Sequence, residues 1–142
     1  MRRLKRLIHL PNIEKRLLFE AALTILIIRI MLKYLTLANL HRAVVVAPGI
    51  WRSSRACAPH RIANAIDKAA RLIARSNCLI QALAGQALLA RYGCKAFLTV
   101  GVARDEDLSF EAHAWVTTQD QVLIGACDTS HYTAILRLEC LP

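Results

Sequence analysis

The sequence Ser76-Asn77-Cys78-Leu79-Ile80 opens an apolar segment that continues to Arg91-Tyr92-Gly93. Ser76 or Asn77 can accept the free amide protons of a first helical turn, and Gly93 supplies the left-handed residue that commonly ends a helix. These signals predict a helix from Cys78 to Tyr92, with Cys78 at its start. The helix dipole favours an anion at that end, so it favours the Cys78 thiolate over the thiol.

The hydrophobic period changes after Gly93, from helical spacing to alternation along residues 96–102, which predicts a strand. A polar loop is expected over 104–110. Three further strands are expected, of which the first two form a hairpin around Gln119-Asp120-Gln121. They cover residues 112–118, 122–127 and 133–138.

The residues before Cys78 are predicted to be mainly helical. Residues 1–12 form a basic arm, a short β-branched patch over 43–47 closes at a Pro48-Gly49 turn, and helices are expected over 14–40 and 59–75. Helices followed by an antiparallel sheet predict an α+β fold. The 142 residues suffice for one domain, residues 1–142, with a basic helical part over 1–75 and an apolar helix and sheet over 76–142.

Charge is divided unevenly between these parts. Residues 1–75 contain 15 Lys/Arg and 3 Asp/Glu, whereas residues 76–142 contain 4 and 7. The basic half either meets an acidic partner or keeps the protein in solution. It lacks interleaved aromatic residues, so we expect no nucleic-acid partner.

The five cysteines are an odd number at irregular spacing, which does not resemble a disulfide framework. The basic start Met1-Arg2-Arg3 resembles an export signal, but Pro11 and charged residues interrupt it before an apolar run begins. We therefore expect a reducing cytoplasmic location. Cys127 with His131, and Cys57 with His60, do not form the paired spacing of a zinc site, and no phosphate-binding glycine loop is present. No metal or cofactor is expected.

The segment from Leu17 to Leu35 is rich in Leu and Ile but contains Glu20, Arg29 and Lys33. Its longest uncharged stretch, residues 21–28, is too short to cross a bilayer. We predict a core helix, or two shorter helices wrapped by the rest of the domain. Membrane contact is not expected, and contact with a membrane surface or a partner is the alternative.

Cys78, His113 and a later Asp follow the order of a nucleophile, its base and the group that orients the base. If the hairpin loop has two residues, His113 faces Ala126 and Asp128 is diagonal to His113 on the same sheet face. If it has four, His113 faces Asp128 directly. Asp128 is therefore the preferred third residue, because Asp120 lies in the turn and would point away. Trp115 shares a sheet face with His113 and would shield the imidazole, floor a cleft or pack in the core.

Three motifs together resemble the lasso-peptide leader peptidases, the "B" maturation proteins of lasso-peptide biosynthesis. They are Asn77-Cys78-Leu79, then Arg91-Tyr92-Gly93 with the strand ending in Gly101-Val102, then Ala112-His113-Ala114-Trp115-Val116. The resemblance covers about residues 75–138. It implies a transglutaminase-like (papain-like) cysteine-protease core with Cys78 as nucleophile, His113 as base and an acidic residue as orienter.

The resemblance also implies partners. Some family members carry a fused precursor-recognition domain, and this chain resembles the free-standing peptidase of a split system. A separate recognition protein would then present the leader of the precursor peptide, and a lasso cyclase would act on the released core. Two other interpretations stay open, namely a non-catalytic transglutaminase-like binding or scaffold module and an acyltransferase on the same core.

Overall fold

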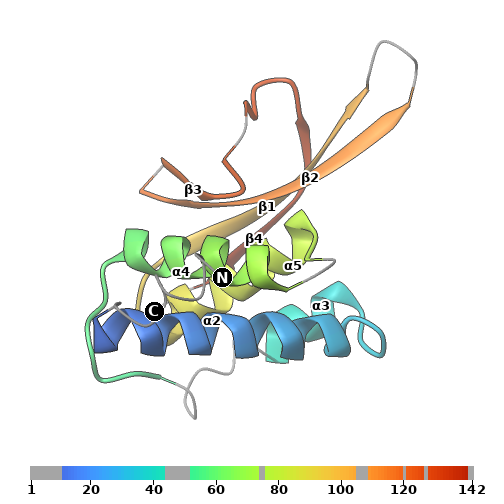
Figure 1. Ribbon diagram of the computed structural model, residues 1–142. Coiled ribbons are helices and arrows are strands. Elements are labelled where there is room, and N and C mark those ends of the chain that lie inside the picture. The colour runs from blue at the N-terminus through green and yellow to red at the C-terminus, as the bar shows by residue number, and fades with distance from the viewer. Residues whose placement is uncertain are drawn as a thin grey trace.

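The computed structural model describes residues 11–43, 52–73, 76–104, 109–119, 121–126 and 128–140. Helices come first in the chain and a four-stranded antiparallel sheet follows, so the predicted α+β class is confirmed (Figure 1). The described helices are α2 (Asn12–Met31), α3 (Leu37–His41), α4 (Pro59–Leu72) and α5 (Cys78–Arg91). The strands are β1 (Ala96–Arg104), β2 (Phe110–Thr118), β3 (Gln121–Ile124) and β4 (Thr133–Cys140).

The limits of α5 agree with the sequence prediction. Asn77 is the N-cap, and its side-chain oxygen accepts a hydrogen bond from the amide of Ile80 at 2.9 Å. Gly93 has a φ of 72°, the left-handed conformation expected at the end of a helix. Local capping chemistry therefore suffices to set both ends of this helix.

The long helix predicted over residues 14–40 is instead divided. α2 ends at Met31, a turn follows, and Thr36 begins α3 by accepting a hydrogen bond from the amide of Asn39 at 3.4 Å. The Thr36 side chain thus stabilises the start of a separate helix. A prediction from the spacing of apolar residues does not take such an N-cap into account. The apolar segment from Leu17 to Leu35 thus contains one helix, which ends at Met31, and not two shorter ones. Among the described residues, no helix is long and apolar enough to cross a membrane.

Other predicted boundaries shift slightly. α4 begins at Pro59, a residue suited to a first helical turn, and ends at Leu72, earlier than predicted. β3 ends at Ile124, whereas the prediction extended to residue 127. β4 begins at Thr133 as predicted and continues to Cys140. The predicted 43–47 patch and Pro48-Gly49 turn fall almost entirely, and the 1–12 arm largely, outside the described residues.

The strands lie in the order β3-β2-β1-β4, and helices cover one face of the sheet (Figure 1). α5 packs directly on β1 and β2, α4 packs beside α5 and reaches β3, and α2 forms the outer layer against α4 and α5. The core between the sheet and the helices contains alternate strand residues, among them Leu98, Ala114 and Val116. One apolar cluster thus joins the helical and the sheet parts of the chain.

The connection from β3 to β4 joins the two opposite edges of the sheet. Its described residues lie on the sheet face away from the helices (Figure 1). Tyr132 packs there, since a Cβ added to Gly101 would lie 3.0 Å from the Tyr132 Cβ and 2.8 Å from the Trp115 ring. This connection therefore builds a second, smaller cluster on the face opposite α5.

Candidate active site

Cys78 is the first residue of α5 and is half-buried at the edge of the apolar core. The preceding turn is held by Asn77 and by Gln81, whose side-chain amide donates to the Ser76 carbonyl at 3.1 Å. The first amides of a helix have no acceptor within it, so the Cys78 and Leu79 N–H groups face the helix start. An oxyanion at this point is favoured by these donors and by the helix dipole.

The other described cysteines are in surroundings that oppose ionisation. Burial raises the pKa values of the Cys57 and Cys94 thiols, and burial raises the pKa of Cys140 to about 11. The Cys94 thiol donates to the Cys57 carbonyl at 3.9 Å, and the Cys140 thiol to the Cys94 carbonyl at 3.6 Å. These three side chains have the character of packing residues rather than nucleophiles.

His113 lies on β2 opposite Gly101 of β1. Its Nε2 atom is 3.0 Å from the carbonyl oxygen of Gly125. A carbonyl only accepts hydrogen bonds, so Nε2 carries the proton, and Nδ1 of the neutral ring holds the lone pair that can accept one. The ring stacks on Trp115 at a centroid distance of 6.1 Å and lies 5.6 Å from Tyr132. The ring is therefore oriented by a backbone carbonyl and two aromatic side chains.

Gly125 is a residue that the sequence analysis did not single out. Its φ is 74°, and a Cβ at this position would lie 2.7 Å from the Ala114 carbonyl oxygen and 3.2 Å from the Trp115 Cα. Only glycine fits both the backbone conformation and the space. The signal available in the sequence was an isolated glycine inside the predicted 122–127 strand, which indicates a bulge or a close backbone approach.

The hairpin register decides between the two predicted positions of Asp128. Thr118 pairs with Gln121, so the loop has two residues, and the four-residue loop that would put Asp128 opposite His113 does not occur. A bulge then shifts the pairing, so that Thr117 pairs with Val122 but Val116 with Ile124. Asp120, the other candidate, is outside the described residues.

Asp128 is exposed in the connection between β3 and β4. Its Oδ1 accepts hydrogen bonds from the Ser130 hydroxyl at 2.6 Å and the Ser130 amide at 3.0 Å. The Ser130 hydroxyl, followed by the Ser130 amide, lowers the pKa of this carboxyl below its usual value. The observed local role of Asp128 is thus to close an Asx-type turn.

The structure does not bring the three predicted residues together. α5 packs on the sheet face of Ala114 and Val116, whereas strand alternation puts His113 on the opposite face with Trp115. Within the part of the chain that is described, no hydrogen bond joins Cys78, His113 and Asp128. Cys78 therefore lies at a helix start on one side of the sheet, and the oriented imidazole lies on the other.

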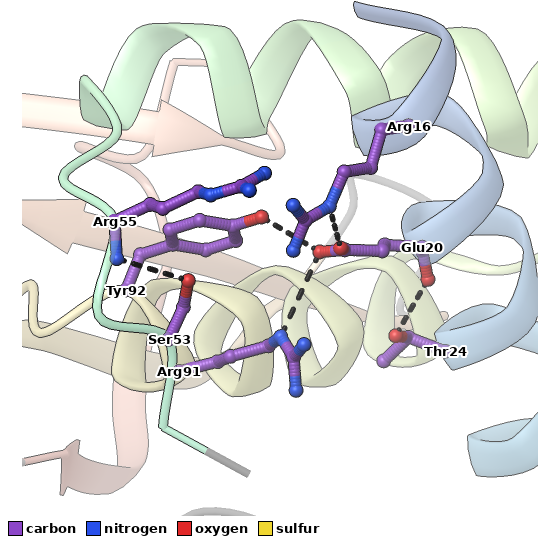
Figure 2. Close-up of polar contacts among 7 residues, drawn as sticks. All are labelled: Arg16, Glu20, Thr24, Ser53, Arg55, Arg91 and Tyr92. Atoms are coloured by element: carbon purple, nitrogen blue, oxygen red, sulfur yellow. Dashed lines mark hydrogen bonds and ion pairs between the residues drawn. The ribbon is translucent and has the colours of Figure 1, made fainter. Parts of the chain in front are cut away.

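A second polar cluster, which the sequence analysis missed, joins α2 to the far end of α5 (Figure 2). The Glu20 carboxylate accepts hydrogen bonds from Arg16 Nε and from the Tyr92 hydroxyl, each at 2.8 Å. The Arg91 Nε lies 3.6 Å from the same carboxylate. Burial, followed by the Glu20 hydrogen bond, raises the pKa of Tyr92. This cluster adjoins a cavity of about 330 Å³ between α2 and α5.

Replacing Tyr92 by phenylalanine tests what this cluster contributes. The variant removes one hydrogen bond to a mostly buried carboxylate, so we expect the free energy of unfolding to fall by about 1–2 kcal/mol. Urea unfolding measures the change, and Tyr34→Phe, at an exposed tyrosine, is the matched control with no expected effect. Equal stabilities for Tyr92→Phe and the unmodified chain would contradict the assigned role.

A family model described as the transglutaminase-like superfamily matches residues 22–137, from the middle of α2 to β4. The chain belongs to the transglutaminase-like superfamily. The match covers the α5 and β2 segments on which the sequence resemblance rested, and it agrees with the fold. Neither the curated proteins nor the solved structures compared with this transglutaminase-like chain include a match. In the described residues, no group of three or more His, Cys, Asp or Glu side chains is placed to hold a metal ion.

Proposed function

We propose that this transglutaminase-like protein is a cysteine peptidase that removes the leader from a lasso-peptide precursor. The observation that carries the proposal is a capped, half-buried Cys78 at the start of α5 within a matched transglutaminase-like domain. The motif Ala112-His113-Ala114-Trp115-Val116, similar to that of the leader peptidases, supports the narrower substrate class. A separate leader-recognition protein would present the precursor, and a cyclase would use the released core.

In the proposed reaction, the Cys78 sulfur attacks the carbonyl carbon at the leader–core junction. His113 Nδ1 takes the thiol proton, because Nε2 already donates to Gly125. The Cys78 N–H at the helix start stabilises the oxyanion. His113 then gives its proton to the departing core amine, and water hydrolyses the thioester to release the leader.

Catalysis requires the Cys78 thiol and the His113 ring to approach within about 3 Å. This approach requires a conformational change at the start of α5, in the orientation of the His113 ring or in the β3–β4 connection. Binding of the precursor and its recognition protein is the proposed cause, and it would also raise the effective substrate concentration. The isolated chain should therefore cleave poorly.

The test combines the purified chain with a leader-bearing precursor and a recognition protein, and follows the products by mass spectrometry. We expect one cut at the leader–core junction, slow without the recognition protein, and inactivation by iodoacetamide with the label on Cys78. Absence of a cut, or inactivation that tracks another cysteine, would refute the proposal. A primary amine added as acceptor separates hydrolysis from acyl transfer, because an acyltransferase would give the amide of the leader.

A second candidate is a non-catalytic transglutaminase-like binding module. The observation in its favour is that Cys78 and His113 lie on different sides of the sheet without a hydrogen bond in the described structure. In this case the Cys78 thiol would not react with iodoacetamide at neutral pH, even in the presence of precursor. Rapid labelling that precursor accelerates would favour the peptidase instead.

A further inference from the structure

The outer face of α2 is apolar although it faces solvent. The sequence predicts that the rest of the domain wraps this segment, but only one stripe, Leu17, Ala21, Ile25 and Ile28, is buried. A second stripe, offset by about half a turn, consists of large apolar side chains spaced three or four residues apart along the exposed side. Its members are Phe19, Leu23, Leu26, Ile27 and Ile30.

This exposed stripe continues into the cavity between α2 and α5. Leu23 and Ile27 belong to both, and Met31, Ala87 and Leu88 line the deeper part. The apolar surface thus consists of the exposed face of α2 and the cavity that adjoins it. Flexible hydrocarbon chains can follow such a surface without a matching rigid shape, and a contiguous exposed apolar patch of this kind indicates an interaction site.

The charges beside the stripe are positive. Lys15 lies one helical turn before Phe19, Lys33 follows Ile30 in the turn after α2, and both are exposed. The acidic residues of the basic half, residues 1–75, are already paired with basic side chains of the protein. The Glu14 carboxylate lies 3.6 Å from Lys68 Nζ, and Glu20 pairs with Arg16. The Asp67 carboxylate lies 2.8 Å from Arg71 Nη2. Within the described residues, no carboxylate neutralises Lys15 or Lys33.

We propose that the outer face of α2 docks on an anionic phospholipid surface, with the helix lying in the plane of the interface. The apolar stripe would enter the boundary between headgroups and acyl chains, while the lysine stems extend toward lipid phosphates. Each cation near an anionic leaflet adds attraction that salt screens. A protein partner would need its own hydrogen-bonding rim, and this face offers mainly apolar groups and cations.

Sedimentation with vesicles tests the proposal without reference to catalytic activity. The full-length chain is mixed with vesicles of phosphatidylcholine and phosphatidylglycerol, or of phosphatidylcholine alone, at low salt and at about 1 M salt. We expect binding to the mixed vesicles at low salt, little binding to the neutral ones, and a marked decrease in high salt. Equal binding to both lipids, or no binding to either, would overturn it.

Matched double variants test which face is used. Phe19→Ser with Ile30→Ser removes side chains that are 70% and 57% exposed, and Phe110→Ser with Leu72→Ser removes two that are 76% and 54% exposed elsewhere. The first pair should weaken vesicle partitioning by about 10- to 100-fold, and the second should not. Circular dichroism confirms that both pairs fold. Equal vesicle partitioning of the two double variants would overturn the proposal. A change of oligomeric state caused by Phe19→Ser with Ile30→Ser in the absence of lipid would also overturn it.

Discussion

Replacing Cys78 by alanine is expected to lower the rate of leader removal by about 10³-fold or more. The alanine side chain cannot form the thioester, and no other described cysteine lies at a helix start. The change deletes a single half-buried sulfur, so we expect the free energy of unfolding to change by less than about 1 kcal/mol. Mass spectrometry of precursor cleavage and urea unfolding of the same samples measure both quantities.

Cys94→Ala is the matched control for this variant. Cys94 is also half-buried, but burial raises the pKa of its thiol, and its thiol lies against backbone carbonyls. We expect Cys94→Ala to cleave at the rate of the unmodified chain. A fully active Cys78→Ala variant would refute the nucleophile assignment, whereas a Cys94→Ala variant that folds normally and is inactive would move it to Cys94.

Local signals in the sequence were sufficient for the helices and strands nearest the candidate site. Asn77 and Gly93 act on their own backbone neighbours, so capping rules located both ends of α5. The alternation around Leu98 similarly predicted β1, because one face of that strand is buried by α5. Features of this kind depend on a few adjacent residues and form in the same way however the rest of the chain packs.

Features that depend on distant packing were not predictable in the same way. The outer stripe of α2 has the composition of a buried helix, and only the layer order shows that nothing in the described structure covers it. The bulge between Thr117 and Val116 adds one residue to β3, which changes every partner beyond it. An argument from loop length alone therefore could not position Asp128.

The candidate site shows both cases. Cys78 at the helix start followed from sequence, but the prediction that it meets His113 assumed that β2 turns His113 toward α5. The alternation of Ala112 to Val116 contains a signal against this assumption, because small aliphatic residues form one face and His113 and Trp115 form the other. A helix packs more closely on the aliphatic face, and the observed core has this arrangement.

Gly125→Ala is expected to cause the largest loss of stability among the variants considered. The left-handed backbone costs about 1–2 kcal/mol for a residue with a Cβ, and the contact with the Ala114 carbonyl adds about 1–3 kcal/mol of overpacking. We expect a total decrease of about 2–5 kcal/mol in the free energy of unfolding, measured with urea. Relief of this contact should also displace the carbonyl of residue 125 itself, which accepts the hydrogen bond from His113 Nε2. Nitrogen NMR of the imidazole detects the released Nε2 as a change of tautomer.

Gly93→Ala separates the two causes of that loss. Gly93 has nearly the same φ, but a Cβ there meets only the Arg52 guanidinium at 3.6 Å, an ordinary contact with a flexible side chain. This control should lose only the backbone term, about 1–2 kcal/mol, and leave the His113 tautomer unchanged. Equal losses for the two variants would mean that close packing at Gly125 contributes nothing. A His113 signal unaffected by Gly125→Ala would mean that the aromatic rings alone orient the imidazole, and Trp115→Leu would then be the variant that releases it.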